Sequence, residues 1–430
     1  MNELDGFYLD VKAGRGGPDP RKRIERALRD NFDIDKHILF VGYKGCGKST
    51  ELNHLQKDIQ DEFLVLNYSV MKELDPVHLN YIELFIVTME QLFSFADSED
   101  KIHISPEYLK NITHWLGTKE IKEINDKFIG LDTEAGAKGT IGVPYLKEFF
   151  YKFKFSAKSS KSLKETIKRN VEPKLSDLIE HCNNLIREIK LQLNNIGKND
   201  LVIIIEDLDK IPIDRAQELF FNYTNQLVSL QTNVVFTFPI SIYNSIKYNN
   251  IREYFSMVRE LPMIKIAEKD GSDNEQGMDV MRKMVEKRMD TSTLIESSEI
   301  LNQMIRDSGG CIRDLFRMIH EAGEIALDYD EEKITEKHRH QSYLALKKEY
   351  ENTIADNTVD GKKYPVEGYY EVLVNLAKNT TKKVDNTEEL LHLRDNLCVL
   401  GYNGEGWCDV HPIVKSILKE RGKWDGNQEA

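Results

Sequence analysis

FVGYKGCGKST, residues 40–50, decides how the rest of this sequence is interpreted. Its spacing G-x-x-x-x-G-K-[ST] is typical of a phosphate-binding loop, in which glycines let backbone N–H groups turn toward an anion. We expect Lys48 to reach the β- and γ-phosphates of ATP and Ser49 to hold Mg²⁺. The expected nucleotide-binding residues of this loop are Gly42, Tyr43, Lys44, Gly45, Cys46, Gly47, Lys48, Ser49 and Thr50.

The segments around the loop favour an α/β fold. A short apolar strand is expected at 37–41, and the helix that begins at Lys48 has apolar residues on one face. A second strand at 63–68 and a helix at 76–93 continue the pattern, and parallel sheets are built from such units. We therefore predict a P-loop NTPase fold with a parallel sheet flanked by helices.

Carboxylates follow another apolar strand, in LVIIIEDLDK at 201–210. We expect Glu206 to hold Mg²⁺ through water and Asp207 to orient the attacking water, with Lys48 completing the catalytic set. The usual order at these positions is Asp and then Asp or Glu, so Glu206 departs from it. The alternative is that these acids only cap a buried strand by binding helix N–H groups.

Two further residues are candidates for sensing the γ-phosphate. Thr237 ends the expected strand 233–238, which follows a helix expected at 214–230. Arg313 follows a glycine pair in GGCIRDL and could reach back across a domain boundary to phosphate. The alternatives are an ordinary strand threonine and a surface arginine paired with an acid such as Asp314 or Glu321.

Composition excludes several classes of protein. The net charge is −13 and the pI about 5.5, so the chain as a whole has no electrostatic footprint for nucleic acid or anionic membrane. Five scattered cysteines without a C-x-x-C pair argue against a disulfide scaffold or zinc site. No apolar run reaches the roughly 20 residues needed to span a bilayer. These features predict a cytoplasmic protein without a membrane anchor.

A large insertion at about 95–170 separates the second and third expected strands. It is basic, since residues 147–174 hold nine Lys or Arg against three Glu. Within it, FFYKFKF alternates aromatic residues with lysine. One interpretation is a half-buried strand with a solvated lysine face, and the other is a surface for single-stranded nucleic acid.

The remaining chain divides into further units. We expect an N-terminal arm at 1–20, the ATPase core at 21–270, a helical lid at 271–350 and a winged helix at 351–430. The winged helix is inferred from helices at 366–379 and 386–396, a hairpin turning through Asn403 to Gly406, and a closing helix.

The order of these motifs resembles the signal-transduction ATPases with numerous domains (STAND) and their AAA+ relatives among replication initiators. VHPIV, 410–414, resembles the Met-His-Asp motif of the NB-ARC winged helix, with Pro412 in place of the acid. The resemblance implies that His411 contacts the ADP β-phosphate, although it could equally cap the last helix. Arg252 and Arg259 occupy a region comparable to that of an AAA+ arginine finger, which acts in the next subunit.

The resemblance implies a slow, regulated ATPase that switches between a closed ADP state and an open ATP state. Effector and sensor are then expected as separate partner proteins, homo-oligomers are possible, and a role in bacterial defence against phage follows by analogy. The alternative is an initiator-like ATPase that binds DNA, although the expected recognition helix 386–396 is acidic. A P-loop kinase or GTPase is disfavoured because no N-K-x-D motif is present.

Overall fold

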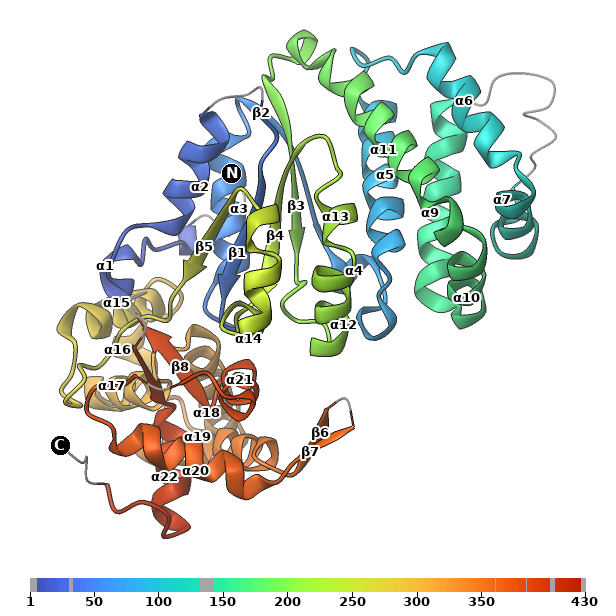
Figure 1. The fold of residues 1–430 in the computed structure, drawn as a ribbon. Helices are drawn as coiled ribbons and strands as arrows, with labels where there is room; N and C mark the ends of the chain where they lie inside the picture. The colour runs from blue at the N-terminus through green and yellow to red at the C-terminus, as the bar shows by residue number, and fades with distance from the viewer. Residues whose placement is uncertain are drawn as a thin grey trace.

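The computed structural model describes residues 6–30, 34–131, 142–359, 361–383, 385–402 and 407–426. Within these ranges a five-stranded parallel sheet forms the centre of the molecule, in the order β2-β3-β4-β1-β5 (Figure 1). The strands are β1 (His37–Gly42), β2 (Phe63–Ser69), β3 (Asp200–Glu206), β4 (Asn233–Pro239) and β5 (Met257–Leu261). The predicted P-loop NTPase sheet is confirmed.

The sheet order places β4 between the strand that leads into the loop and the strand that leads into the acids. Thr237 on β4 is therefore paired in register with Phe40 of β1. Because every strand of this sheet is parallel to its neighbours, the carboxyl ends share one edge, where ligands of open α/β sheets bind. Strands β1, β3 and β4 are buried along their whole length, as central parallel strands should be.

Helices flank the sheet (Figure 1). The helices of this core region are α2 (Pro20–Arg29), α3 (Lys48–Ile59), α4 (Val70–Glu73), η2 (Pro76–His78), α5 (Tyr81–Ser98), α11 (Leu175–Lys190) and α14 (Ile240–Tyr243). The helix expected at 76–93 begins later, at Tyr81, because Asn80 and Glu83 form a capping box there. The helix expected at 214–230 is broken into α12 (Ile213–Gln217), the π-turn η6 (Glu218–Asn222) and α13 (Thr224–Leu227).

The insertion is helical, and Figure 1 shows it beyond α5, on the far side of the core from α2. Its elements are α6 (Pro106–Leu116), α7 (Lys119–Ile124), η3 (Asn125–Ile129), α9 (Val143–Ser159) and α10 (Lys161–Asn170). FFYKFKF lies in α9, so the strand prediction was wrong. Phe149, Phe150 and Phe153 are buried at helical spacing, and this periodicity of 3.6 prevails over the apparent alternation.

Lysines of α9 form ion pairs with acidic residues of the protein itself. Lys154 is buried and pairs with Glu73 at 2.7 Å and with Glu90 at 3.1 Å. Lys152 pairs with Glu148 one turn earlier, at 2.9 Å. The aromatic and lysine residues therefore do not form a flat sheet surface on which bases could stack.

The C-terminal third contains the expected elements. A helical group is followed by α20 (Val366–Lys378), α21 (Glu388–Asp395), the antiparallel pair β8 (Val399–Tyr402) and β9 (Trp407–Val410), and α22 (Pro412–Glu420). The expected turn Asn403 to Gly406 lies outside the described residues. The helical group comprises α15 (Glu275–Glu286), α16 (Thr291–Leu294), α17 (Ser298–Asp307), α18 (Ile312–Asp328) and α19 (Glu336–Thr353), after which come the short strands β6 (Asn357–Val359) and β7 (Lys362–Tyr364).

The N-terminal arm packs on this helical group. Val11 belongs to the apolar core formed by α15, α17 and α18. The short helix α1 (Lys12–Arg15) follows, and the carbonyl of Gly14 accepts a hydrogen bond from the Lys265 N–H at 2.8 Å. No helix in the described ranges combines the length and apolar character needed to cross a membrane.

Candidate nucleotide site

The loop between β1 and α3 has the backbone that its glycines predict. Gly45 and Gly47 adopt φ of 80° and 102°, which side chains with a Cβ rarely tolerate. Helix α3 then begins at Lys48. The strand, glycine loop and helix therefore follow one another as the phosphate-binding motif requires.

Lys48 is held inside the protein. Its Nζ donates to the carbonyls of Gly42 and Tyr43, both at 2.8 Å, and lies 2.9 Å from Oδ2 of Asp209. Burial is the largest single effect and favours the neutral amine, but the attractions of Asp209, Cys46 and Asp207 together raise the pKa of Lys48. Lys48 is therefore charged, and the acid bound to it lies two positions beyond the acid assigned to catalysis.

Glu206 lies beside the expected Mg²⁺ ligand Ser49. Burial raises the pKa of the Glu206 carboxyl, and hydrogen bonds from Ser49 and Asn67 oppose this effect. Among the described residues, no group of three or more His, Cys, Asp or Glu could hold a metal by itself. A magnesium ion would therefore depend on Ser49, Glu206 and the phosphates, and these two side chains are adjacent as that role requires.

Asp207 is held by two contacts at the end of β3. Its Oδ2 accepts a hydrogen bond from Ser69 at 2.5 Å, and its Oδ1 pairs with Lys210 at 2.5 Å. Its φ of 69° is left-handed, which is uncommon for a residue with a side chain. Such strain persists where the surroundings enforce it, often at functional sites. The strand prediction alone did not reveal Ser69 as a partner from β2.

Thr237 is buried next to the acids. Its hydroxyl accepts a hydrogen bond from the Leu208 N–H at 2.9 Å and lies 3.4 Å from the carbonyl of Ile205. The side chain therefore ties β4 to the turn that follows Glu206 and Asp207.

Two arginines from distant segments lie on the loop. Nη2 of Arg15, from the N-terminal arm, donates to the carbonyl of Cys46 at 2.6 Å, and its Nη1 donates to the carbonyl of Pro262. Arg313, at the start of α18, packs against Gly45 so closely that a Cβ on this glycine would lie 2.6 Å from the Cβ of Arg313. The lid residue singled out in the sequence is thus in contact with the loop.

The hairpin and α21 also contact the loop. A Cβ on Gly401 of β8 would lie 2.8 Å from the hydroxyl of Tyr43. Lys44 pairs with Asp395 of α21 at 3.1 Å, and Ser241 of α14 donates to the other oxygen of Asp395 at 3.3 Å. None of these partners carried a motif, so only the folded structure could reveal them.

His411 contacts residues of α18 and α19. It is fully buried and stacks on Tyr350, with ring centroids 4.6 Å apart. Its Nδ1 accepts a hydrogen bond from the Ile413 N–H at 3.2 Å, so it caps α22. Its Nε2 lies 3.6 Å from Oδ2 of Asp314, the residue after Arg313. The other oxygen of Asp314 lies 3.7 Å from Nε of Arg313, so His411 is linked to the loop through Asp314 and then Arg313.

Arg252 and Arg259 lie apart from these contacts. Arg252, in the short helix η8 (Arg252–Tyr254), has a side chain that is 57% exposed. Arg259 lies on β5, where its Nη1 donates to the carbonyl of Val258 at 2.7 Å. A role for either as an arginine finger stays a prediction, since it requires a second subunit.

Comparison with known proteins supports the fold. Residues 38–240 match the family model described as the KAP family P-loop domain, a span that contains the loop, both acids and Thr237. No curated protein matches the chain.

Several solved structures are distantly similar to this chain. The Holliday junction branch migration motor RuvB of Thermotoga maritima is 10% identical, with a TM-score of 0.35 over 97% of this chain and 100% of that one. The ORC2 protein of Aeropyrum pernix is 9% identical, with a TM-score of 0.38 over 98% and 99%. Cdc6p of Pyrobaculum aerophilum is 11% identical, with a TM-score of 0.37 over 97% and 98%. At scores this low, these likenesses carry no functional conclusion.

Proposed function

We propose that this protein is an ATP-binding and ATP-hydrolysing molecular switch of the STAND/AAA+ type. The observation that carries the proposal is that segments far apart in the chain meet on one short loop. Arg15 of the arm, Arg313 of the lid and Gly401 of the hairpin each contact residues 43–47. A nucleotide bound to that loop would therefore alter contacts to each of these segments, as a ligand-controlled switch requires.

The residues around the loop have distinct chemical roles in this proposal. Lys48 leaves Asp209 and binds the β- and γ-phosphates, while Asp207 orients the attacking water. Ser69 and Lys210 fix the position of the Asp207 carboxylate. When bound by Ser49 and Glu206, Mg²⁺ supplies charge neutralisation for the phosphates.

Nucleotide sensing is assigned to Arg313 and Thr237, with His411 acting behind Arg313. Asp314 follows Arg313 and is bound by the hydroxyl of Tyr350 at 2.6 Å as well as by His411. A phosphate that drew Arg313 toward it would also displace Asp314, because the two residues are adjacent in α18. The displacement would then reach α19 and α22, which carry Tyr350 and the His411 cap.

Contacts of α21 argue against DNA binding by this helix. The expected recognition helix α21 packs against α14 of the core, and its Asp395 is bound by Lys44 and Ser241. A DNA-binding helix must be free to enter a groove and should carry positive charge. We propose separate effector or sensor proteins as partners. The resemblance suggests a role in defence against phage. For that role, bacterial cells that express the protein should be protected against phage, and Lys48→Ala should abolish the protection.

ATP turnover tests the proposal. We expect Asp207→Asn to slow hydrolysis by about a hundredfold or more, because positioned proton acceptors contribute on this scale. Glu206→Gln should raise the Mg²⁺ concentration needed for half-maximal rate. Glu107→Gln, an exposed acid in α6 of the insertion, is the matched control. If both Asp207→Asn and Glu206→Gln hydrolyse ATP at the wild-type rate, the assignment of these acids is wrong.

Native mass measurement tests the switch itself. The purified protein is compared in ADP and in non-hydrolysable ATP, and the two nucleotides should give different assemblies or different bound partners. A partner-free monomer in both nucleotides would count against the switch.

A further inference from the structure

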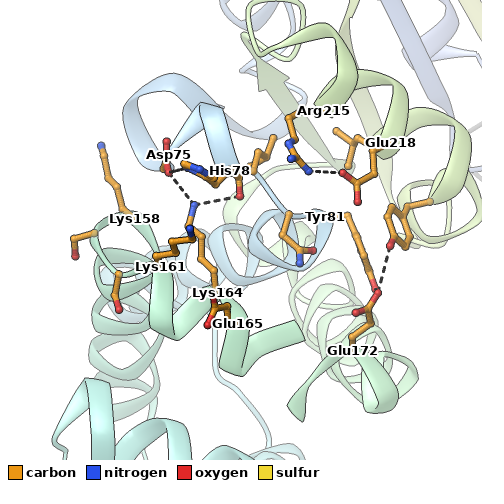
Figure 2. A pocket seen from close by; sticks show the side chains of 16 residues that line it. Asp75, His78, Tyr81, Lys158, Lys161, Lys164, Glu165, Glu172, Arg215 and Glu218 are labelled. Atoms are coloured by element: carbon orange, nitrogen blue, oxygen red, sulfur yellow. Dashed lines mark hydrogen bonds and ion pairs between the residues drawn. The ribbon is translucent and has the colours of Figure 1, made fainter. Parts of the chain in front are cut away.

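A second pocket lies between the basic insertion and the core, away from the phosphate-binding loop (Figure 2). Its volume is about 550 Å³, within the range of about 300 to 1,000 Å³ that is typical of small-molecule sites. One wall comes from the end of α9 and the start of α10. The other walls come from the segment after β2 and from α12 and η6, which follow β3.

The insertion wall is basic. Lys158, Lys161 and Lys164 lie along it, with Ser159 and Ser160 between the helices (Figure 2). Lys164 is already committed, since it pairs with Asp75 at 3.2 Å and with Glu83 at 3.5 Å.

Lys158 donates to the carbonyl of Lys72, so Lys161 is the lysine of this wall that remains for a ligand. It is exposed, and the contacts between described residues include no hydrogen-bond or ion-pair partner for its amine. It is also the first residue of α10, so the positive end of the helix adds to its charge. An anionic group would therefore be favoured at this end of the pocket.

The opposite wall is aromatic and rigid. The rings of Tyr81 and Tyr223 stack with centroids 3.7 Å apart. Both hydroxyls donate to Oε1 of Glu172, at 3.4 and 3.3 Å, which fixes the pair in place. Tyr223 is partly exposed, and Leu219 lies beside it on the pocket surface. A planar ring could pack here, while the second oxygen of Glu172 could accept a hydrogen bond from it.

We infer that this pocket binds a phosphorylated small molecule with a planar ring, of about the size of a nucleoside monophosphate. The phosphate lies toward Lys161 and the ring toward Tyr223 and Leu219. Eight of the sixteen lining residues are charged, so the pocket is more polar than a typical small-molecule site and favours a ligand that carries a charge. The pocket is distinct from the phosphate-binding loop, so this binding does not depend on the proposed ATPase function.

The position of the pocket connects it to the candidate catalytic acid. Asp75, on one wall of the pocket, lies six residues after Ser69 in the chain, and the hydroxyl of Ser69 donates a hydrogen bond to Asp207. Arg215, on another wall, lies eight residues after Asp207 in α12 and pairs with Glu218 at 2.6 Å. A ligand that moves either wall would shift the Asp207 carboxylate and alter ATP hydrolysis. This coupling alone rests on the proposed function.

Calorimetry on the full chain tests the binding. The protein is first saturated with ADP and Mg²⁺ so that the loop is filled, and AMP, GMP, CMP and UMP are then titrated separately. We expect at least one of them to bind at one equivalent. Lys161→Glu should weaken this binding by roughly ten- to a hundredfold, the size expected for a lost hydrogen bond to a charged group. Lys152→Glu, the same charge change outside the pocket, should bind as wild type does.

Two further ligands test the binding of the ring and of the phosphate separately. Tyr223→Ala should weaken the binding of the best monophosphate and of its own nucleoside alike, while leaving the binding of ribose 5-phosphate unchanged. The inference is overturned if no monophosphate binds at millimolar concentration, or if Lys161→Glu binds it as tightly as Lys152→Glu does. Glutamate suits the first turn of a helix, and thermal unfolding of Lys161→Glu verifies that the variant is folded.

ATP turnover tests separately whether the pocket is coupled to Asp207. Bound monophosphate should change the ATP turnover of wild type at least twofold and leave that of Lys161→Glu unchanged, while an unchanged wild-type rate overturns the coupling. If ADP does not bind the loop, the proposed function fails. The comparison of Lys161→Glu with Lys152→Glu still decides the pocket in that case.

Discussion

Substituting Gly401 by alanine should release the C-terminal unit from the phosphate-binding loop. The new Cβ would lie 2.8 Å from the hydroxyl oxygen of Tyr43 and 3.2 Å from its Cε2. Tyr43 is 2% exposed and aromatic, so it cannot bend away from the new methyl group. The Gly401 carbonyl also accepts the Met263 N–H at 3.2 Å, which holds the strand in place.

The expected magnitude follows from the cost of overpacking. An extra methyl group in a filled site costs about 1–3 kcal/mol. Because Tyr43 belongs to the loop and Gly401 to the hairpin, this cost falls on the docked arrangement and not on either part alone. The undocked population should therefore rise by roughly 5- to 150-fold.

Hydrogen exchange measured by mass spectrometry checks this expectation. Peptides that cover β8 and the loop should exchange faster in Gly401→Ala by that factor, and a fluorescent ADP analogue should dissociate faster. Gly323→Ala is the control, because Gly323 lies inside α18 and its added methyl group would meet no packing neighbour within 4 Å. If folded Gly401→Ala exchanges and releases ADP as Gly323→Ala does, the contact with Tyr43 does not hold the unit in place.

Three further outcomes follow from buried charges. Lys48→Met leaves the carboxylate of Asp209 buried and unpaired, so without nucleotide it should lower the free energy of unfolding in urea by about 3–5 kcal/mol. Adding Asp209→Asn should recover part of that loss, and equal stability of Lys48→Met and wild type would contradict the pairing. Burial raises the pKa of Glu83 to about 7 from 4.5, so the folded state binds the proton more tightly. Its contribution to stability is present below pH 4.5 and is lost as the pH rises through about 7, a change of about 3 kcal/mol at about 1.4 kcal/mol per pKa unit. Glu83→Gln, which keeps the helix cap, should flatten this dependence in urea titrations across that range, and an unaltered slope would refute it. Lys154→Met should destabilise the fold by about 1–3 kcal/mol because its glutamate partners lose their cation. The exposed Lys152→Met should change stability by less than about 0.5 kcal/mol.

Local pattern predicted much of the core of this fold. The strands at 37–41, 201–205 and 233–238 are apolar runs bounded by turns, and a fully buried parallel strand gives that signal. Strand β2 lies at one edge of the sheet and is only partly buried, but its sequence is still mostly apolar, so it was predicted as well. Strand β5, at the other edge, was missed because Arg259 and Glu260 interrupt its short apolar run.

The site was predictable only where its residues are close in sequence. The loop, Glu206 and Asp207 carry motifs, and Arg313 stands out because glycines precede it. Asp209 and Ser69 carry no such signal, since each matters through one contact with a residue from another strand. Such contacts depend on strand order, and the position of β4 between β1 and β3 is a property of the whole sheet.

In the proposed function, the contact between Lys48 and Asp209 competes with ATP for the same lysine. A phosphate that binds Lys48 would have to displace a carboxylate that is tethered beside it at a high effective concentration. The apparent affinity for ATP would then reflect the difference between two ion pairs, and Asp209 would set the threshold ATP concentration at which the loop fills. A sequence change at this one acid could retune that threshold without altering the phosphate-binding motif.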